Sequence, residues 1–139
     1  MGPGKNYIIP EPRGVVLVMG AWNYPLFTLI PAAATCIAAG NAVILKPSEL
    51  SPHTSNLIAK LFKDHLDNGL YRVIEGAVNV AINITKQPLD LIFFVGGTEK
   101  GKLVAKAAAE NLVPCILELG GKSPCVVDGS GDLEMVGRR

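Results

Sequence analysis

Apolar residues gather in short continuous runs along this chain. Between two of these runs Leu57, Ile58, Leu61 and Phe62 recur at the spacing of an amphipathic helix, and other stretches between runs are rich in alanine. The runs are rich in β-branched and aromatic residues, which is typical of strands buried on both faces of a sheet. We therefore predict strands over residues 14–20, 41–45, 70–76, 90–96 and 114–120. The stretches between them predict helices over residues 25–40, 51–66, 78–86 and 97–112. A sixth strand is expected at 124–129, and a further helix begins near residue 132.

Proline and glycine support several of these boundaries. Pro25 can open the first helix, Gly40 is a natural C-cap, and Ser51 followed by Pro52 has the pattern of a capped helix start. Strands that alternate with helices predict an α/β fold, in which a parallel sheet carries helices on both faces. The chain shows no internal repeat or linker, so we expect a single domain.

Composition narrows the functional classes. Of the 139 residues 49% are hydrophobic and 18% are charged, which argues against disorder. The net charge is +1 without a basic run, so no nucleic-acid partner is expected. Neither histidine has a partner at ligand spacing, so no metal site is expected. An odd set of three scattered cysteines without a secretion signal predicts reduced thiols and a cytoplasmic location.

One uncharged stretch could suggest a membrane segment. No charged residue occurs between Arg13 and Lys46, a length that could span a bilayer. Asn23 and several prolines and glycines interrupt it, and they would leave backbone groups unpaired in lipid. We interpret the stretch as strand, loop, helix and strand inside a protein. The membrane alternative predicts solubility only in detergent.

The segment "GGTEKGKL" at 96–103 matches a phosphate-binding loop except at its last position. There Leu103 stands where a magnesium-binding hydroxyl is needed, which disfavours a nucleotide triphosphatase. A strand that runs through glycines into a helix still offers free N–H groups to a pyrophosphate. The segment therefore indicates a phosphate-bearing cofactor, with a plain glycine turn as the alternative.

Polar side chains follow three of the predicted strands. Asn23 could donate a neutral hydrogen bond to an oxyanion, and Lys46 with Glu49 could bind sugar hydroxyls. Glu118 ends the fifth strand next to glycines and could act as a general base if it is buried. Alternatively, Asn23 could bond its own backbone in a turn, and Lys46 and Glu49 could lie in a solvated loop. Glu118 could equally be an ordinary surface residue.

The two cysteines near Glu118 are poor candidates for its catalytic partner. Cys115 and Cys125 both lie within apolar runs, where a thiol is expected to be inert core. An activated thiol needs an electropositive and partly exposed environment.

Four segments together resemble the aldehyde dehydrogenase superfamily: "GAWNYP", "AAGNAVILKPSE", "FVGGTEKGK" and "LELGGKSP". The resemblance covers about residues 7–139 and is greatest for the class 3 branch, which includes fatty aldehyde dehydrogenases. It implies a Rossmann-like NAD(P)-binding domain over residues 1–139. It also implies oxidation of an aldehyde substrate to a carboxylic acid, with NAD as the cofactor and NADP as a second option.

The resemblance also implies roles for individual residues. Asn23 would hold the oxyanion, Glu118 would activate water, and Tyr24 would line the substrate site. The cofactor would be bound by Trp22, Lys46, Glu49, Gly76, Gly96, Gly97, Gly101, Leu119 and Gly120. Gly97 stands where many members carry serine in the pyrophosphate turn, so one hydroxyl contact is lost.

The resemblance places the nucleophilic cysteine shortly beyond Arg139, so we expect a fragment that ends before the catalytic-cysteine region and is inactive alone. The full-length parent would be a homodimer and could carry a C-terminal membrane tail. The alternative is an inactive module that binds a dinucleotide or pairs with another subunit. Either reading requires Asn23, the turn at Gly96 and Glu118 to converge on one crevice along the same edge of the sheet.

Overall fold

The structure is a computed structural model that describes residues 4–139, and it contains a five-stranded sheet. The strands are β1 (Val15–Met19), β2 (Ala42–Lys46), β3 (Tyr71–Val73), β4 (Leu91–Val95) and β5 (Cys115–Glu118). Their order is β3-β2-β1-β4-β5, and every neighbouring pair is parallel. This is the order of a Rossmann-type half, in which the chain reverses its direction of growth beside β1. The α/β prediction is confirmed.

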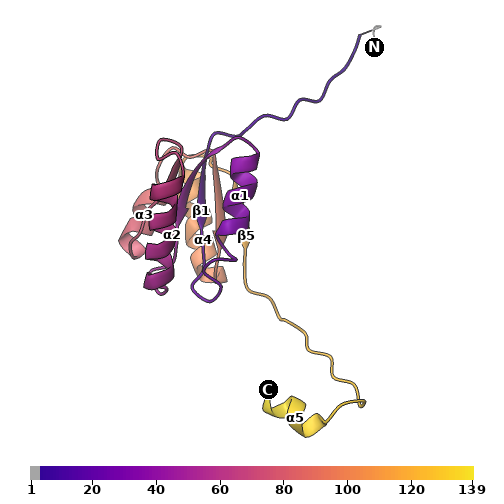
Figure 1. Cartoon of the computed structure of the whole chain (residues 1–139). Helices are drawn as coiled ribbons and strands as arrows, with labels where there is room; N and C mark the ends of the chain where they lie inside the picture. Colours follow the sequence, from indigo (N-terminus) through magenta and orange to yellow (C-terminus); the bar gives the residue numbers. More distant parts are fainter. Residues whose placement is uncertain (1–3) are drawn as a thin grey trace.

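Helices cover both faces of this sheet. They are α1 (Ile30–Ala38), α2 (Pro52–His65), α3 (Val78–Thr85) and α4 (Thr98–Glu110), and α5 (Leu133–Arg138) lies apart from the sheet (Figure 1). The alternation along β1 divides the core, because successive side chains point to opposite faces. Val16 and Val18 pack with residues of the α1 and α2 layer, while Leu17 and Met19 pack with α3 and α4.

Polar side chains fix the start of the central strand. The Asn41 Oδ1 atom accepts hydrogen bonds from the N–H groups of Arg13 (2.7 Å) and Gly14 (3.1 Å). The Asp90 carboxylate accepts from Val15 N–H at 2.7 Å. Gly14 has a φ of +127° and a Cβ there would overlap the Asp90 carboxylate, so only glycine fits. The amino ends of β1, β2 and β4 are thereby held in register.

The predicted sixth strand at 124–129 is wrong. The segment is extended but pairs with no strand of the described chain, and Val126 is 93% exposed. Figure 1 shows the chain leaving the sheet after β5. Cys125 is exposed as well, so its assignment to an apolar core is also wrong.

The first helix begins later than predicted, at Ile30 rather than Pro25. Residues 25–29 form turns instead, and Thr28 makes side-chain hydrogen bonds within this loop. Its hydroxyl donates to the Tyr24 carbonyl at 3.0 Å and accepts from Ala21 N–H at 3.0 Å. None of the helices in the described part of the chain combines the length and hydrophobicity needed to cross a membrane.

Candidate functional site at the carboxyl edge of the sheet

The carboxyl ends of four strands meet at one edge, because the register pairs Met19 with Lys46 and with Phe94, and Val95 with Glu118. A cavity of about 870 Å³ opens at this edge. Nine of the site residues expected from the sequence line it: Trp22, Asn23, Lys46, Glu49, Gly96, Gly97, Glu118, Leu119 and Gly120. Asn23, the Gly96 turn and Glu118 therefore do border one crevice, at the point where the strand order reverses.

Three expected site residues do not line the cavity. Tyr24 is 66% exposed and lies outside it. Gly76 has a φ of +144°, and a Cβ there would overlap the Val80 side chain. Gly101 lies inside α4, where a Cβ would come within 2.6 Å of Leu119 Cδ2. Both glycines act on the shape of the site through packing rather than by bordering the cavity.

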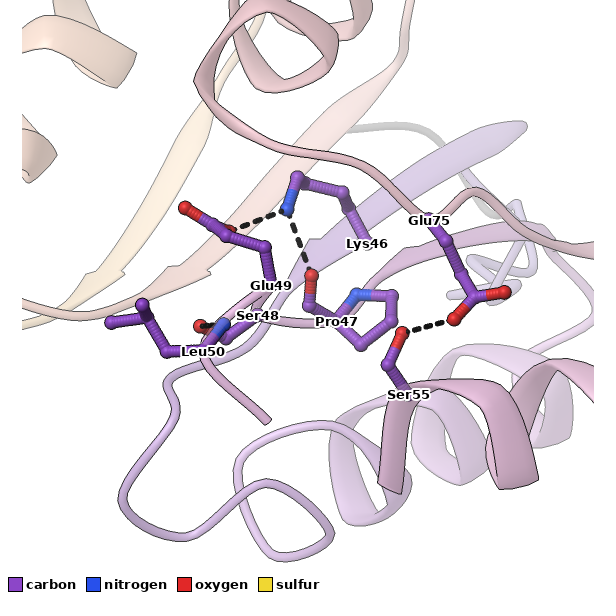
Figure 2. A network of polar contacts seen from close by, with 7 residues as sticks. All are labelled: Lys46, Pro47, Ser48, Glu49, Leu50, Ser55 and Glu75. Carbon is purple, nitrogen blue, oxygen red and sulfur yellow. Dashed lines mark hydrogen bonds and ion pairs between the residues drawn. The ribbon is translucent and has the colours of Figure 1, made fainter. Parts of the chain in front are cut away.

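Lys46 and Glu49 form an ion pair at the wall of the cavity (Figure 2). Lys46 is 4% exposed, and its Nζ donates to the Pro47 carbonyl at 2.8 Å and to Glu49 Oε2 at 3.3 Å. The pKa of Glu49 is lowered, chiefly by a hydrogen bond from its own backbone, with the Lys46 charge adding to the effect. Partial burial opposes this shift without reversing it. The pair presents one donor group and one acceptor group side by side, the combination that vicinal hydroxyls require.

A second contact in Figure 2 steadies the neighbouring wall. The buried Ser55 of α2 donates its hydroxyl proton to Glu75 Oε1 at 2.6 Å. This bond joins α2 to the segment that leaves β3 and leads through Gly76 into α3. The position of α3 beside the cavity is therefore linked to α2 on the other face of the sheet.

The turn between β4 and α4 carries the two glycines at the cavity. A Cβ at Gly96 would lie 2.7 Å from Phe94 Cζ, whereas a Cβ at Gly97 would meet nothing within 4 Å. Gly97 is the N-cap of α4, and no side chain caps the first turn of that helix. The helix start consequently keeps backbone N–H groups and a positive dipole end for an anionic ligand.

Glu118 is the last residue of β5 and is exposed, so the burial on which its expected basicity depended is absent from this chain. None of the three cysteines lines the cavity. Burial raises the pKa of the Cys36 and Cys115 thiols. The site thus has an amide, a carboxylate and a cation at its border, but no thiol.

Sequence reasoning missed the apolar walls of the cavity. One wall belongs to α3 and the other to α4, and they consist of Val78, Ala81, Ile82, Thr85, Leu103, Val104 and Ala107. Lys100 borders the same space from the first turn of α4. On each helix these positions, with Lys100 included on α4, follow the i, i+3, i+4, i+7 spacing, a signal in the sequence that could have indicated their cavity faces.

Fold and site together define the class: a parallel α/β domain whose ligand crevice lies at the switch point of the sheet. The family model described as "Aldehyde dehydrogenase family" matches residues 3–138. Family 3 member A2 from Macaca fascicularis is 53% identical over 135 residues, which are 97% of this chain and 28% of that protein. This chain belongs to the aldehyde dehydrogenase family.

Solved structures agree with this assignment. The substrate-bound state of Staphylococcus aureus AldH matches with a TM-score of 0.83 and 40% identity, over 93% of this chain and 28% of that one. The Mycobacterium tuberculosis aldehyde dehydrogenase complexed with NAD+ matches with a TM-score of 0.75 and 40% identity, over 81% and 24%. The chain spans about a quarter of the length of the proteins it matches.

Proposed function

We propose that this chain is the dinucleotide-binding part of an NAD-dependent aldehyde dehydrogenase. One observation carries the proposal: a single cavity at the switch point joins the Lys46–Glu49 pair, the Gly96–Gly97 turn and Asn23. The similarity to an aldehyde dehydrogenase complexed with NAD+ supports the same cofactor here. When bound, the nicotinamide would supply the hydride acceptor for oxidation of an aldehyde to a carboxylic acid.

The residues of the cavity fit the parts of such a cofactor. Lys46 and Glu49 offer a donor and an acceptor to the adenosine ribose hydroxyls. The uncapped start of α4 with its glycine turn would receive the pyrophosphate. The apolar faces of α3 and α4 leave a groove for the flat adenine base. The negative charge of Glu49 disfavours a further phosphate on the ribose, so we expect NAD to bind more tightly than NADP.

The chemical step would use two further residues of this chain. The Asn23 amide would donate a hydrogen bond to the aldehyde's carbonyl oxygen as it becomes an oxyanion, without adding a charge of its own. Glu118 is exposed in this chain, so it would activate water for release of the acid only where the rest of the parent covers it. Since no cysteine borders the cavity, the 139-residue chain should bind the cofactor without turning over aldehyde. That observation also favours the second candidate, a module that holds a dinucleotide without catalysis.

Calorimetry with NAD tests the proposal directly. We expect saturable binding to the folded chain and a loss of about 10- to 100-fold in affinity for Lys46→Met, because hydrogen bonds from charged groups contribute about 1.5–3 kcal/mol. Lys60→Met removes an ammonium from an exposed position on α2 that does not line the cavity, and it should leave NAD affinity unchanged. Absence of heat at millimolar NAD with an intact fold would contradict the proposal.

Three broader proposals concern the inactivity of this chain, the oligomeric state of the parent and its location in the cell. Turnover of fatty or aromatic aldehydes by this chain with NAD would contradict its expected inactivity. A homodimeric parent predicts a dimer mass in sedimentation equilibrium for the longer protein. A cytoplasmic location is supported by three free thiols and can be checked by cell fractionation.

A further inference from the structure

The loop between β1 and α1, which carries Asn23, is held at its backbone by two hydroxyl side chains. Ala21 N–H donates to the Thr28 hydroxyl at 3.0 Å, and that hydroxyl donates to the Tyr24 carbonyl at 3.0 Å. The Ser51 hydroxyl donates to the Trp22 carbonyl at 2.9 Å. The residues on both sides of Asn23 are therefore fixed through their carbonyl groups, while Asn23 itself lines the cavity.

The two hydroxyls differ in the range over which they act. Thr28 ties the loop to itself across seven residues or fewer. Ser51 lies 29 residues after Trp22, at the start of α2. Its bond joins the loop of Asn23 to the loop of Lys46 and Glu49, so the two halves of the proposed site are connected by one hydroxyl.

Ser51 makes this bond in place of the one that its position predicts. It is the N-cap residue of α2, where a serine oxygen usually accepts from a backbone N–H of the first turn. Its φ and ψ are −124° and 60°, and it makes no side-chain cap bond. Pro52 follows at the first helical position and has no N–H to satisfy, which lessens the loss. The first turn of α2 therefore lacks a side-chain cap, and the Ser51 hydroxyl bonds the loop of Asn23 instead.

We propose that Ser51 is a positioning residue that holds the Trp22 carbonyl and thereby keeps the adjacent Asn23 amide in one orientation at the cavity. Ser51 itself touches neither substrate nor cofactor in this scheme. The role of the Asn23 amide as an oxyanion donor rests on the proposed function. The hydrogen bond and its effect on the loop do not, since they exist in the chain without any ligand.

Trp22 is a suitable reporter because it is the only tryptophan of the chain and is 59% exposed. We would measure acrylamide quenching of its fluorescence in the free chain, in three Ser51 variants and in one control variant. Ser51→Ala removes the donor. Ser51→Asp supplies a good helix cap that can only accept, and Ser51→Thr keeps the donor. Thr54→Ala is the control, since it removes a hydroxyl from the same turn of α2.

We expect the quenching constant to rise for Ser51→Ala and Ser51→Asp, by less than twofold because Trp22 is already 59% exposed. The rise follows because losing one hydrogen bond shifts the open-to-closed ratio of the loop about fivefold. Ser51→Thr and Thr54→Ala should match the parent chain. If Ser51 served only to start α2, Ser51→Asp would leave quenching unchanged while the urea midpoint held or rose, and that result overturns the proposal. Failure of Ser51→Thr to match the parent would overturn it as well.

Circular dichroism and urea midpoints show whether each variant is folded. Should Ser51→Ala unfold, Ser51→Asp carries the test, since it retains a capped helix start. The fluorescence measurement needs no cofactor. If the chain fails to bind NAD but shows these quenching changes, the proposed function is contradicted and the positioning role of Ser51 is supported. If the chain binds NAD but the Ser51 variants quench like the parent chain, the proposed function is supported and the positioning role is contradicted.

Discussion

Replacing Gly20 by alanine should destabilise the chain, although the backbone there is of ordinary conformation. Gly20 directly follows β1, and its N–H donates to the Lys46 carbonyl at 3.2 Å. A Cβ would overlap the centre of the Leu29 side chain and come within 2.9 Å of its Cδ2 and 3.0 Å of Thr28 Oγ1. Leu29 is 0% exposed and packed in the core, so it has no room to retreat.

The magnitude follows from two opposing effects. Forcing a methyl group into a packed core costs about 1–3 kcal/mol. Replacing glycine lowers the entropy of the unfolded chain, which returns about 0.4–1 kcal/mol. We therefore expect Gly20→Ala to lower the free energy of unfolding by about 1–2 kcal/mol.

Gly101→Ala is the matched comparison, since its Cβ would also be close to a leucine, 2.6 Å from Leu119 Cδ2. Leu119 is 39% exposed, and the near atom is the end of its side chain, which can rotate away. Gly101 lies inside α4, where alanine is favoured over glycine by about 0.8–1 kcal/mol. We expect this variant to be as stable as the parent or more stable, with a changed cavity border at Leu119.

Urea unfolding of the two variants and of a double-mutant cycle checks the reasoning. Leu29→Ala alone should cost about 2–5 kcal/mol. Combined with Gly20→Ala it should cost less than the two effects together, by about 1 kcal/mol, because the new methyl occupies the vacated space. A Gly20→Ala chain as stable as the parent, or strict additivity in the cycle, would refute the argument.

Two further predictions concern titrating groups. In the folded chain Ellman's reagent at pH 8 should react first with Cys125, which is exposed, and slowly with Cys36 and Cys115, because burial raises the pKa of both thiols and lowers their thiolate fraction. Cys125→Ser should abolish the fast phase, and equal rates for all three thiols would contradict the burial. The pKa of Glu49 lies below its ordinary 4.5, so its contribution to stability is complete above that value and is lost as pH falls through the lower folded pKa. Glu49→Gln should reduce the fall in urea midpoint between pH 5 and pH 3, and identical acid profiles would contradict the shift.

The sheet was predictable because its strands are short and apolar on both faces, and glycine and proline separate them from the helices. The failures arise where a pattern depends on a partner that the sequence does not name. Residues 124–129 have the composition of a strand, but a strand also needs a neighbour, and none pairs with it in the described chain. Pro25 can open a helix, yet the residues that follow it form turns and α1 begins only at Ile30.

The strand-end residues of the site were predictable because parallel strands bring their carboxyl ends to one edge. Motif positions do not reveal which way a residue faces, so they give no sign that Tyr24, Gly76 and Gly101 lie outside the cavity lining. Ser51 has the pattern of a helix cap, and nothing local indicates that its hydroxyl bonds a carbonyl 29 residues away. Such contacts become visible only when the two loops are placed in space.

The central place of β1 has a consequence for synthesis of the chain. β1 can pair with β2 soon after both have emerged from the ribosome, but its other edge waits for β4, and the bond between Val15 and Asp90 joins residues 75 apart. At about 5–20 residues per second that wait lasts about 4–15 s. During this time the second edge of β1, a strand without a polar side chain, exposes unpaired backbone N–H and C=O groups to neighbouring nascent chains. The residue pattern that makes β1 the best-buried strand of the finished protein thus makes it the element most in need of a chaperone while the protein is being made.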